Sequence, residues 1–400
     1  MNPTLSKFLF LNAGHLFTHL FMLLYPTVVL TLEIEWHRPY SELIALSLPG
    51  FIAYAAGALP AGWLADRYGR KSVLSIFFVG IGAASILTGF ARSPAEIAAG
   101  LGLIGLFASI YHPVGIAMVV EGRAKVGKAL GINGVWGNMG VAAGALVAGV
   151  LTDLLGWRFA FFVPGAIALA VGIAFVALVK VAPATRHPRG GPALDATGRR
   201  VSRSIFLVIA IGTLGSGLIF NATTVSLPKL FEEGLTMLHG SVTGIGGIVS
   251  VIVAIAAFVQ IGTGVLIDRY PVKPIWLSIL LLEAPLLVLA GWAAGAGLLV
   301  LAIPLVFLVL GEIPIQDALV ARYTSEAWRS RVYAAKFVLS IGSSVAIVPL
   351  IAVFHGATGS FLGFYALLAG IAVIVAIAAS FLPYRVRTHD RADAEPLAAE

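Results

Sequence analysis

Long apolar stretches alternate with short polar segments along the whole chain. An α-helix needs about 20 mainly apolar residues to cross the hydrocarbon core of a bilayer, and each stretch has roughly that length. The pattern therefore predicts an all-α membrane protein with twelve membrane-spanning helices. These helices are expected over Phe8–Leu30, Leu43–Ala65, Ser72–Ala91, Ile97–Val120, Ala129–Leu151, Phe159–Val179, Ile205–Leu227, Ser241–Ile267, Ile275–Trp292, Gly297–Val320, Val332–Phe354 and Phe361–Leu382.

The polar segment between the sixth and seventh predicted helices divides the chain into two halves. It is rich in proline, glycine and arginine, a composition typical of flexible linkers. We therefore expect a six-helix bundle over residues 1–181, a cytoplasmic linker over 182–203 and a second six-helix bundle over 204–384. Residues 385–400 are expected to form a polar cytoplasmic tail.

Composition and charge agree with a membrane protein. Hydrophobic residues make up 59% of the 400 residues and charged residues 11%, whereas soluble domains contain about 25% charged residues. Most of the 26 lysines and arginines lie at the two termini and in alternate polar segments, which the positive-inside rule places in the cytoplasm. The net charge of +7 thus reflects the orientation of the chain in the membrane and not a surface for nucleic acid, so no nucleic-acid partner is expected. We expect a multi-pass protein of a bacterial inner membrane with both termini in the cytoplasm.

A ten-residue segment recurs half a chain later. Residues 62–71 read GWLADRYGRK and residues 264–273 read GVLIDRYPVK. Both copies lie where a predicted helix ends in a short charged loop. A duplicated loop in a hydrophobic chain indicates two homologous helical bundles that face each other, an architecture typical of transporters.

The first copy also matches a family signature. It resembles the pattern G-x-L-A-D-R-x-G-R-K that members of the major facilitator superfamily carry between their second and third helices, and residues 156–162 (GWRFAFF) resemble the start of that superfamily's sixth helix. The resemblance covers the whole chain. It implies twelve helices in two pseudo-symmetric six-helix bundles that move a small molecule by alternating access. It also implies that this loop latches the cytoplasmic side in the outward-facing state.

Carboxyl groups in the two loop copies are candidates for this gating role. Asp66 and Asp268 stand at helix-to-loop junctions, where a carboxylate can satisfy the positive end of a neighbouring helix. We expect the basic residues of the first copy to pair with Asp66 or with lipid phosphates, and Asp317 to pair with Lys336. The predicted gating residues are Gly62, Asp66, Arg67, Gly69, Arg70, Lys71, Asp268, Arg269, Asp317 and Lys336.

Three further stretches resemble the fosmidomycin-resistance branch of drug:proton antiporters. They are residues 14–19 (GHLFTH), 111–113 (YHP) and 137–140 (GNMG). The chain departs from that branch at His19, where an aspartate is usual, and at Val114, where a glutamate is usual. The resemblance implies proton-coupled efflux of a small organic compound.

Ionisable side chains inside the predicted helices mark further candidates, because a charge at mid-membrane costs roughly 2.5–3.5 kcal/mol on insertion scales. His15 and His19 are four residues apart and share one helix face. His112 precedes Pro113, which cannot donate to the helical ladder and predicts a kink. Each histidine can bind a proton or a polar substrate, or it can be a buried group that its neighbours satisfy.

The second half contributes two carboxyl groups. Glu283 and Glu312 lie in predicted helices that contain no cationic residue. Aligning Pro314 with Pro113 places Glu312 opposite Tyr111, which makes Glu312 the best candidate for a coupling or substrate-binding carboxyl group. The full set of candidate substrate- or proton-binding residues is His15, His19, His112, Tyr111, Asn133, Trp136, Asn138, Asn221, Gln260, Glu283, Glu312 and Gln316.

The residues favour a secondary transporter that uses protons as coupling ion, binds a small molecule and works as a monomer without a cofactor. Proton-linked uptake or facilitated diffusion of a metabolite or lipid-like compound is the alternative within this class. A non-transporting receptor or scaffold is an alternative of a different class. An enzyme that uses the membrane histidines and Glu312 as metal ligands is not expected, because the chain has no H-E-x-x-H or nucleotide-binding motif. The chain also lacks cysteine, and no metal site is predicted.

Overall fold

A computed structural model describes residues 3–121, 126–179, 203–323 and 326–384. Within these residues, twelve helical segments are long and apolar enough to cross a membrane, which confirms the predicted all-α fold with twelve spans. The linker and tail predicted at 182–203 and 385–400 lie outside the described residues, apart from Arg203, where α9 begins. The elements are α1 (Pro3–Glu35), α2 (Tyr40–Ala45), α3 (Leu48–Tyr68), α4 (Arg70–Gly89), α5 (Pro94–Ala108), η1 (Tyr111–Gly115), α6 (Ile116–Val120), α7 (Val126–Leu155), α8 (Phe159–Leu178), α9 (Arg203–Gly234), η2 (Thr236–Leu238), α10 (Val242–Arg269), α11 (Val272–Trp292), α12 (Gly295–Gly311), α13 (Ile313–Tyr323), α14 (Glu326–Thr358) and α15 (Leu362–Ser380).

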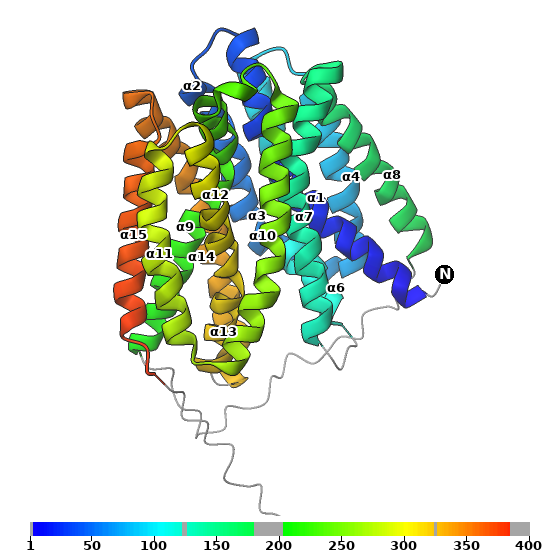
Figure 1. The fold of residues 1–400 in the computed structure, drawn as a ribbon. Coiled ribbons are helices and arrows are strands. Elements are labelled where there is room, and N and C mark those ends of the chain that lie inside the picture. Colours follow the sequence, from blue (N-terminus) through cyan, green and yellow to red (C-terminus); the bar gives the residue numbers. More distant parts are fainter. Residues whose placement is uncertain (1–2, 122–125, 180–202, 324–325, 385–400) are drawn as a thin grey trace, which may run out of the picture.

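The helices form two six-helix bundles that lie side by side (Figure 1). In the first bundle α1 packs along α7, α4 along α8, and α3 along α5. In the second bundle α11 packs along α15, α14 along α9, and α10 along α12. The bundles meet where α7 contacts α10, where α14 contacts α2 and α3, and where α1 contacts α9. This arrangement confirms the predicted pair of bundles.

The fourth and tenth crossings are interrupted at corresponding places. In the fourth, a π-helical turn, η1, separates α5 from α6 and contains Pro113. In the tenth, α12 ends at Gly311 and α13 begins at Ile313, just before Pro314. Each interruption coincides with a proline, which removes a backbone donor and clashes with the preceding turn. The interruption predicted at Pro113 is therefore confirmed, and it has a counterpart in the other half near Pro314.

The contact between α7 and α10 is tight at one end and open at the other. A Cβ built at Gly149 would lie 2.5 Å from the carbonyl oxygen of Val242, and one built at Gly246 would collide with the backbone of Ala145. The two helices are antiparallel, so these contacts lie at the end of the molecule that holds the loops after α1, α7 and α9. Toward the opposite end, nothing lies within 4 Å of a Cβ built at Gly131, Gly134, Gly262 or Gly264.

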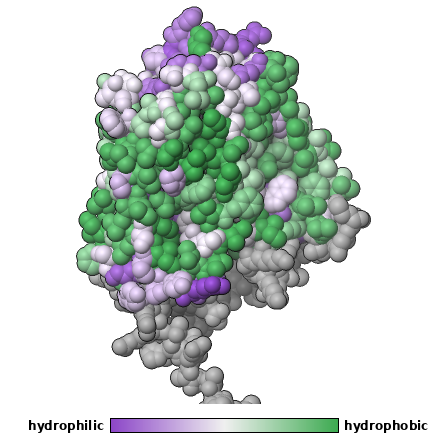
Figure 2. Space-filling model, in the orientation of Figure 1, coloured by the Kyte–Doolittle hydropathy of each residue, from purple (hydrophilic) through white to green (hydrophobic). Residues whose placement is uncertain are grey.

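The surface has the distribution that a bilayer requires. Apolar side chains cover the visible face of the helices, and polar side chains gather at the two ends (Figure 2). Many large apolar side chains are exposed, among them Val251, Leu281 and Ile374, each more than half accessible. Such a surface is soluble only in hydrocarbon. The chain is a multi-pass membrane protein.

The tight end of the α7–α10 contact predicts opposite effects for two glycine substitutions in α10. Gly246→Ala is expected to lower the melting temperature of the purified protein, because forcing a methyl group against backbone costs about 1–3 kcal/mol. Gly262→Ala is the matched control, since it adds a methyl group to open space and improves helix propensity. Thermal unfolding in detergent measures both. Equal melting temperatures would show that α7 and α10 do not make the close approach described here.

Candidate functional site

A buried polar network surrounds His15 in the first bundle. The Nδ1–H of His15 donates to the backbone carbonyl of Asn133, 2.7 Å away. The side-chain amide of Asn133 donates to Asn12 (2.9 Å) and to the hydroxyl of Tyr111 (2.9 Å). The Tyr111 hydroxyl donates to the carbonyl of Leu11 (2.7 Å), and its ring stacks on His15 with centroids 5.0 Å apart. The network joins α1, η1 and α7, so it fixes one imidazole at the interruption of the fourth crossing.

Two more imidazoles adjoin this network. The Nε2 atoms of His15 and His19 are 3.3 Å apart, which confirms that the two residues share a helix face. His112 joins them from η1, with its ring centroid 5.3 Å from that of His15 and 5.5 Å from that of His19. One ring nitrogen from each of the three residues lies within 4.8 Å of the other two. His15 is buried, whereas His19 and His112 are half-buried. The sequence predicted the shared face of His15 and His19 but not that His112 lies against both of them.

A second buried cluster occupies the corresponding place in the other bundle. Oε1 of Glu312 accepts a hydrogen bond of 3.1 Å from the indole N–H of Trp276. Glu283 is fully buried and lies within electrostatic reach of Glu312. Neither oxygen of the Glu283 carboxyl group has a hydrogen-bond partner among the described residues. Among the described residues, the two carboxyl groups thus share a site in which Glu312 has a hydrogen-bond donor and Glu283 has none.

Gln316 links these carboxyl groups to α9. Its side-chain amide donates to the hydroxyl of Ser216 (3.1 Å) and its carbonyl accepts from the hydroxyl of Thr213 (3.4 Å). Gln316 follows Glu312 by four residues, which places both on the same helix face, and both are buried. The cluster thus spans α9, α11 and the α12–α13 junction. Trp276, Ser216 and Thr213 were not predicted, because nothing in their spacing indicates contact with Glu312.

The signature loop, residues 62–71, does not make the expected ion pairs with Asp66. Asp66 is exposed and makes no hydrogen bond or ion pair with the described residues, so the expected pairing with Asp66 is not found in this state, and the alternative pairing with lipid phosphates stays a prediction. Lys71 instead donates to the carbonyl of Val176 (3.1 Å). Arg67 lies over the ring of Trp63, with its guanidinium carbon 5.9 Å from the ring centroid. The physical reason is that adjacent residues of one helix do not face each other, so Arg67 points away from Asp66, while Arg70 and Lys71 lie on α4, beyond the turn at Gly69.

Glu121 is the acidic partner that sequence reasoning missed. Its carboxylate pairs with Lys7 at 2.6 Å and with Arg70 at 3.2 Å, which ties the signature loop to the ends of the first and fourth crossings. Partial burial alone would raise the pKa of Glu121, but the hydrogen bond and charge of Lys7, followed by those of Arg70, hold this pKa below its usual value. Glu121 is the acid that directly follows the fourth apolar stretch, which was the available signal.

Asp317 and the second loop copy, residues 264–273, have different partners. Asp317 forms an ion pair with Lys336 between α13 and α14, which confirms the expected pairing. Lys273 donates to the carbonyls of Ser380 (2.6 Å) and Leu382 (2.9 Å) at the end of α15. Asp268 is exposed at the end of α10. Both copies are thus anchored mainly within their own bundle.

The tight end of the molecule carries a charged cluster that joins the two bundles. Lys229 of α9 pairs with Glu33 of α1 at 2.6 Å and with Glu232 of its own helix at 2.8 Å. The lysine side chain is only 7% exposed. Nearby, the carboxylate of Asp153 in α7 accepts the backbone N–H of Thr243 in the first turn of α10 (2.7 Å). These contacts cross between bundles, and sequence analysis did not predict them because the partners are far apart in the chain.

The remaining predicted residues do not gather at one place. Asn221 donates to the carbonyl of Gly217 in its own helix (2.8 Å) and to the hydroxyl of Ser343 in α14 (3.4 Å). Gln260 has a buried side-chain amide nitrogen without a hydrogen-bond partner among the described residues. Trp136 is 37% exposed on α7, and Asn138 is half-buried. None of these four joins the histidine or the carboxyl cluster through a hydrogen bond within the described part of the chain.

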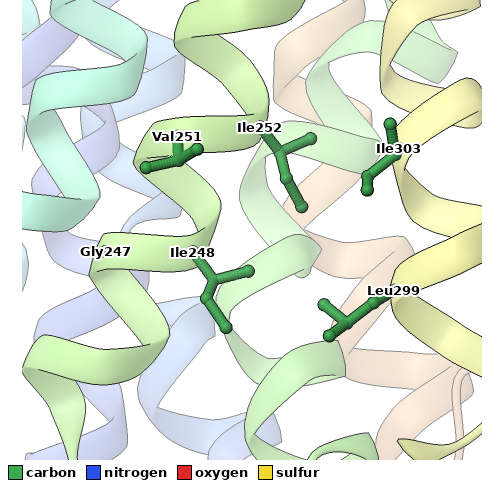
Figure 3. A pocket seen from close by; sticks show the side chains of 6 residues that line it. All are labelled: Gly247, Ile248, Val251, Ile252, Leu299 and Ile303. Carbon is green, nitrogen blue, oxygen red and sulfur yellow. The ribbon is translucent and has the colours of Figure 1, made fainter. Parts of the chain in front are cut away.

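An apolar pocket of about 280 Å³ lies between α10 and α12 (Figure 3). Five branched aliphatic side chains and one glycine line it: Gly247, Ile248, Val251, Ile252, Leu299 and Ile303. It offers no polar group to orient a polar ligand, so it fits an acyl chain of the surrounding lipid better than a polar substrate.

Comparisons with known proteins identify the family. The chain matches the model of the Major Facilitator Superfamily over residues 10–311. It is 32% identical to the puromycin resistance protein pur8 of Streptomyces alboniger over 30% of this chain, but the match spans only 24% of that relative. It is 26% identical to the multidrug resistance protein MdtG of Yersinia enterocolitica over 64% of each protein. These names agree with the predicted likeness to drug exporters, whereas the narrower likeness to fosmidomycin-resistance proteins stays a prediction.

The fold agrees with that of solved transporters. A bacterial homolog of the human lysosomal transporter Spinster, solved in an inward-facing and unoccupied conformation, is 16% identical and superposes with a TM-score of 0.75 over 95% of this chain and 96% of that chain. Because the family model covers about three quarters of the sequence, this chain belongs to the Major Facilitator Superfamily of membrane transporters.

Proposed function

We propose that this protein is a secondary active transporter that exports a small organic molecule across a bacterial inner membrane by alternating access, in exchange for protons. The observation that carries the proposal is the shape of the contact between the bundles. The bundles are held together by close packing and ion pairs at one end, whereas toward the other end a Cβ built at the glycines 131 and 134 of α7 or 262 and 264 of α10 meets nothing within 4 Å. A contact that closes one end only is what alternating access requires.

The distribution of basic residues supports placing the open end of the molecule in the cytoplasm. The signature loops, with their basic residues, lie at the open end, and the positive-inside rule places such loops in the cytoplasm. On this assignment the Lys229–Glu33 cluster closes the external side, and the state is open to the cytoplasm. Both chain termini are then cytoplasmic.

The carboxyl cluster is the proposed proton site. A charged carboxylate without a hydrogen-bond donor in an apolar interior costs several kcal/mol. Glu283 has no donor among the described residues and faces the charge of Glu312, so the pair is best accommodated with a bound proton. The indole of Trp276 stabilises the charged form of Glu312. Glu312 is therefore the group that can release and accept the proton, and Glu283 disfavours the state in which both are charged.

The cargo is proposed to contact the first bundle near the half-buried His19 and His112. The surrounding wall is aromatic, with Tyr54 8% exposed and Tyr111 fully buried. Imidazoles in such a wall suit an organic molecule with a few polar groups. Relatives named for resistance to drugs make efflux of such a molecule the expected direction.

The signature loop is the proposed cytoplasmic gate. The Lys7–Glu121–Arg70 cluster anchors the loop to its own bundle. Asp66 remains exposed on that anchored loop. It is therefore available to meet the other bundle when the cytoplasmic side closes, where a helix terminus or a basic side chain would stabilise its charge.

Removing the proton-binding carboxyl group is expected to abolish gradient-driven transport. Glu312→Gln keeps the size and hydrogen-bonding capacity of the side chain but cannot release a proton. In liposomes with an imposed pH gradient and a panel of drugs and metabolites, the variant should lose uphill flux while its melting temperature stays close to that of the wild type. Glu42→Gln, which alters an exposed carboxylate, should transport normally. Undiminished accumulation by Glu312→Gln would remove this residue from the coupling mechanism.

Weakening the external cluster is expected to open the external side. The chain has no cysteine, so a single cysteine at Ala222, a buried position two turns before Lys229 on the same face of α9, reports access. Glu33→Gln should raise the rate of labelling by an impermeant maleimide added outside roughly tenfold, because a charge-assisted hydrogen bond contributes about 1.5–3 kcal/mol. Glu42→Gln, whose ion pair with Arg38 is exposed, should leave the rate unchanged. Equal rates in both variants would contradict a role for Glu33 in closure.

Neutralising Asp66 is expected to slow turnover more than it weakens substrate binding, since the residue is proposed to act on conformational exchange and not on the cargo. Asp66→Asn should therefore lower the maximal transport rate and leave the dissociation constant nearly unchanged. Flux in liposomes and binding in detergent measure the two quantities separately. Wild-type turnover in this variant would mean that the loop serves membrane orientation alone.

A further inference from the structure

We propose that His15, His19 and His112 form a binding site for a divalent transition-metal ion of the Zn²⁺, Co²⁺ and Ni²⁺ class. One nitrogen from each ring lies within 4.8 Å of the other two. The Nε2 atoms of His15 and His19 are 3.3 Å apart. In a tetrahedral site with metal–nitrogen bonds of about 2.0–2.1 Å, two ligand nitrogens are about 3.3 Å apart. The first two ligands thus already have the spacing of a metal site.

The tautomer of His15 leaves its Nε2 atom available as a metal ligand. A backbone carbonyl can only accept, so the 2.7 Å bond to Asn133 places the ring hydrogen on Nδ1. In the neutral ring the lone pair is then on Nε2, which is the nitrogen that faces His19. Metal-binding histidines are usually oriented in this way, with the second nitrogen donating to a carbonyl or carboxylate.

The surroundings hold this first ligand rigidly. The Tyr111 ring stacks on His15 at an interplanar angle of 19°. Gly137 of α7 has no side chain where the imidazole lies, since a Cβ built there would be 2.6 Å from Cε1 and Nε2 of His15. A ring held by this stacking and by the close approach of α7 loses little conformational freedom when a metal binds, and this pre-organisation favours affinity.

The other two ligands supply access and an open position. His19 and His112 are half-buried, so a cation can reach the cluster without unfolding of the bundle. Three protein ligands leave the fourth tetrahedral position for water or for a donor atom of another molecule. Imidazole nitrogen prefers Zn²⁺, Co²⁺, Ni²⁺ or Cu²⁺ to Mg²⁺ or Ca²⁺, which prefer oxygen. The class of ion follows from this donor set.

Metal titration of the purified full-length protein tests the site. The protein should carry an affinity tag without histidines and be treated with a chelator before use. We expect one equivalent of Co²⁺ per chain, seen as visible absorption bands, displacement of Co²⁺ by Zn²⁺, and no competition from Mg²⁺. His15→Gln, His19→Gln and His112→Gln should each weaken binding at least about tenfold, the lower end of what loss of a supporting partner costs a metal site. His239→Gln, in the segment between α9 and α10, is the histidine control and should bind normally.

A pair of glycine substitutions tests the geometry without removing any ligand. Gly137→Ala places a methyl group against the His15 ring and should weaken Co²⁺ binding by at least about tenfold, comparable to loss of a supporting group. Gly134→Ala, one turn away on α7, meets nothing within 4 Å and should leave the affinity unchanged. If a histidine variant fails to fold, this pair of glycine variants still tests whether the metal binds at the His15 ring.

Two results would overturn the site. One is the absence of stoichiometric Co²⁺ or Zn²⁺ binding to the intact protein, and the other is binding that survives all three histidine substitutions. The inference does not rest on the transport proposal, because the titration requires no flux. Glu312→Gln should retain metal affinity, so a failure of proton coupling and a failure of the metal site are distinguishable.

Discussion

The cost of burying unpaired polar groups governs the interior of this protein. Hydrocarbon offers no hydrogen bonds, so each polar group at membrane depth needs a partner inside the chain. One of the two buried clusters meets this requirement, and the other meets it only in part. Asn133, Tyr111 and His15 satisfy one another around the interruption of the fourth crossing. Glu312 receives the indole of Trp276, while Glu283 is buried with no partner among the described residues. The proposed mechanism therefore places the proton switch in the second cluster.

Most of the fold was predictable because it depends on local composition. The apolar stretches are long, and the charged loops between them are distinct, so twelve spans and two bundles followed directly. The proline at position 113 also predicted its interruption, since its effect is confined to one turn. Helix ends were less predictable: α1 continues from Leu30 to Glu35, because backbone hydrogen bonding continues into the interface after the apolar stretch ends.

The site was predictable only where partners are close in sequence. His15 and His19 share a face because they are four residues apart on one helix. The pairings of Trp276 with Glu312 and of Glu121 with Lys7 join residues 36 and 114 positions apart, and no periodicity encodes such contacts. The lack of a partner for Asp66 among the described residues has the same origin. Nearby basic residues were the obvious partners, but Arg67 lies over Trp63, and Arg70 pairs with Glu121, which is far away in the sequence.

Pseudo-symmetry places different chemistry at equivalent positions of the two halves. The interrupted fourth crossing carries imidazoles, and the interrupted tenth crossing carries carboxyl groups. Imidazoles bind cations and polar molecules while neutral, whereas a buried carboxyl pair responds mainly to protons. The proposed mechanism accordingly assigns ligand binding to the first bundle and proton binding to the second. The bundles meet at Lys229 and Glu33, so in this mechanism a change in either cluster that alters its bundle acts on that shared contact.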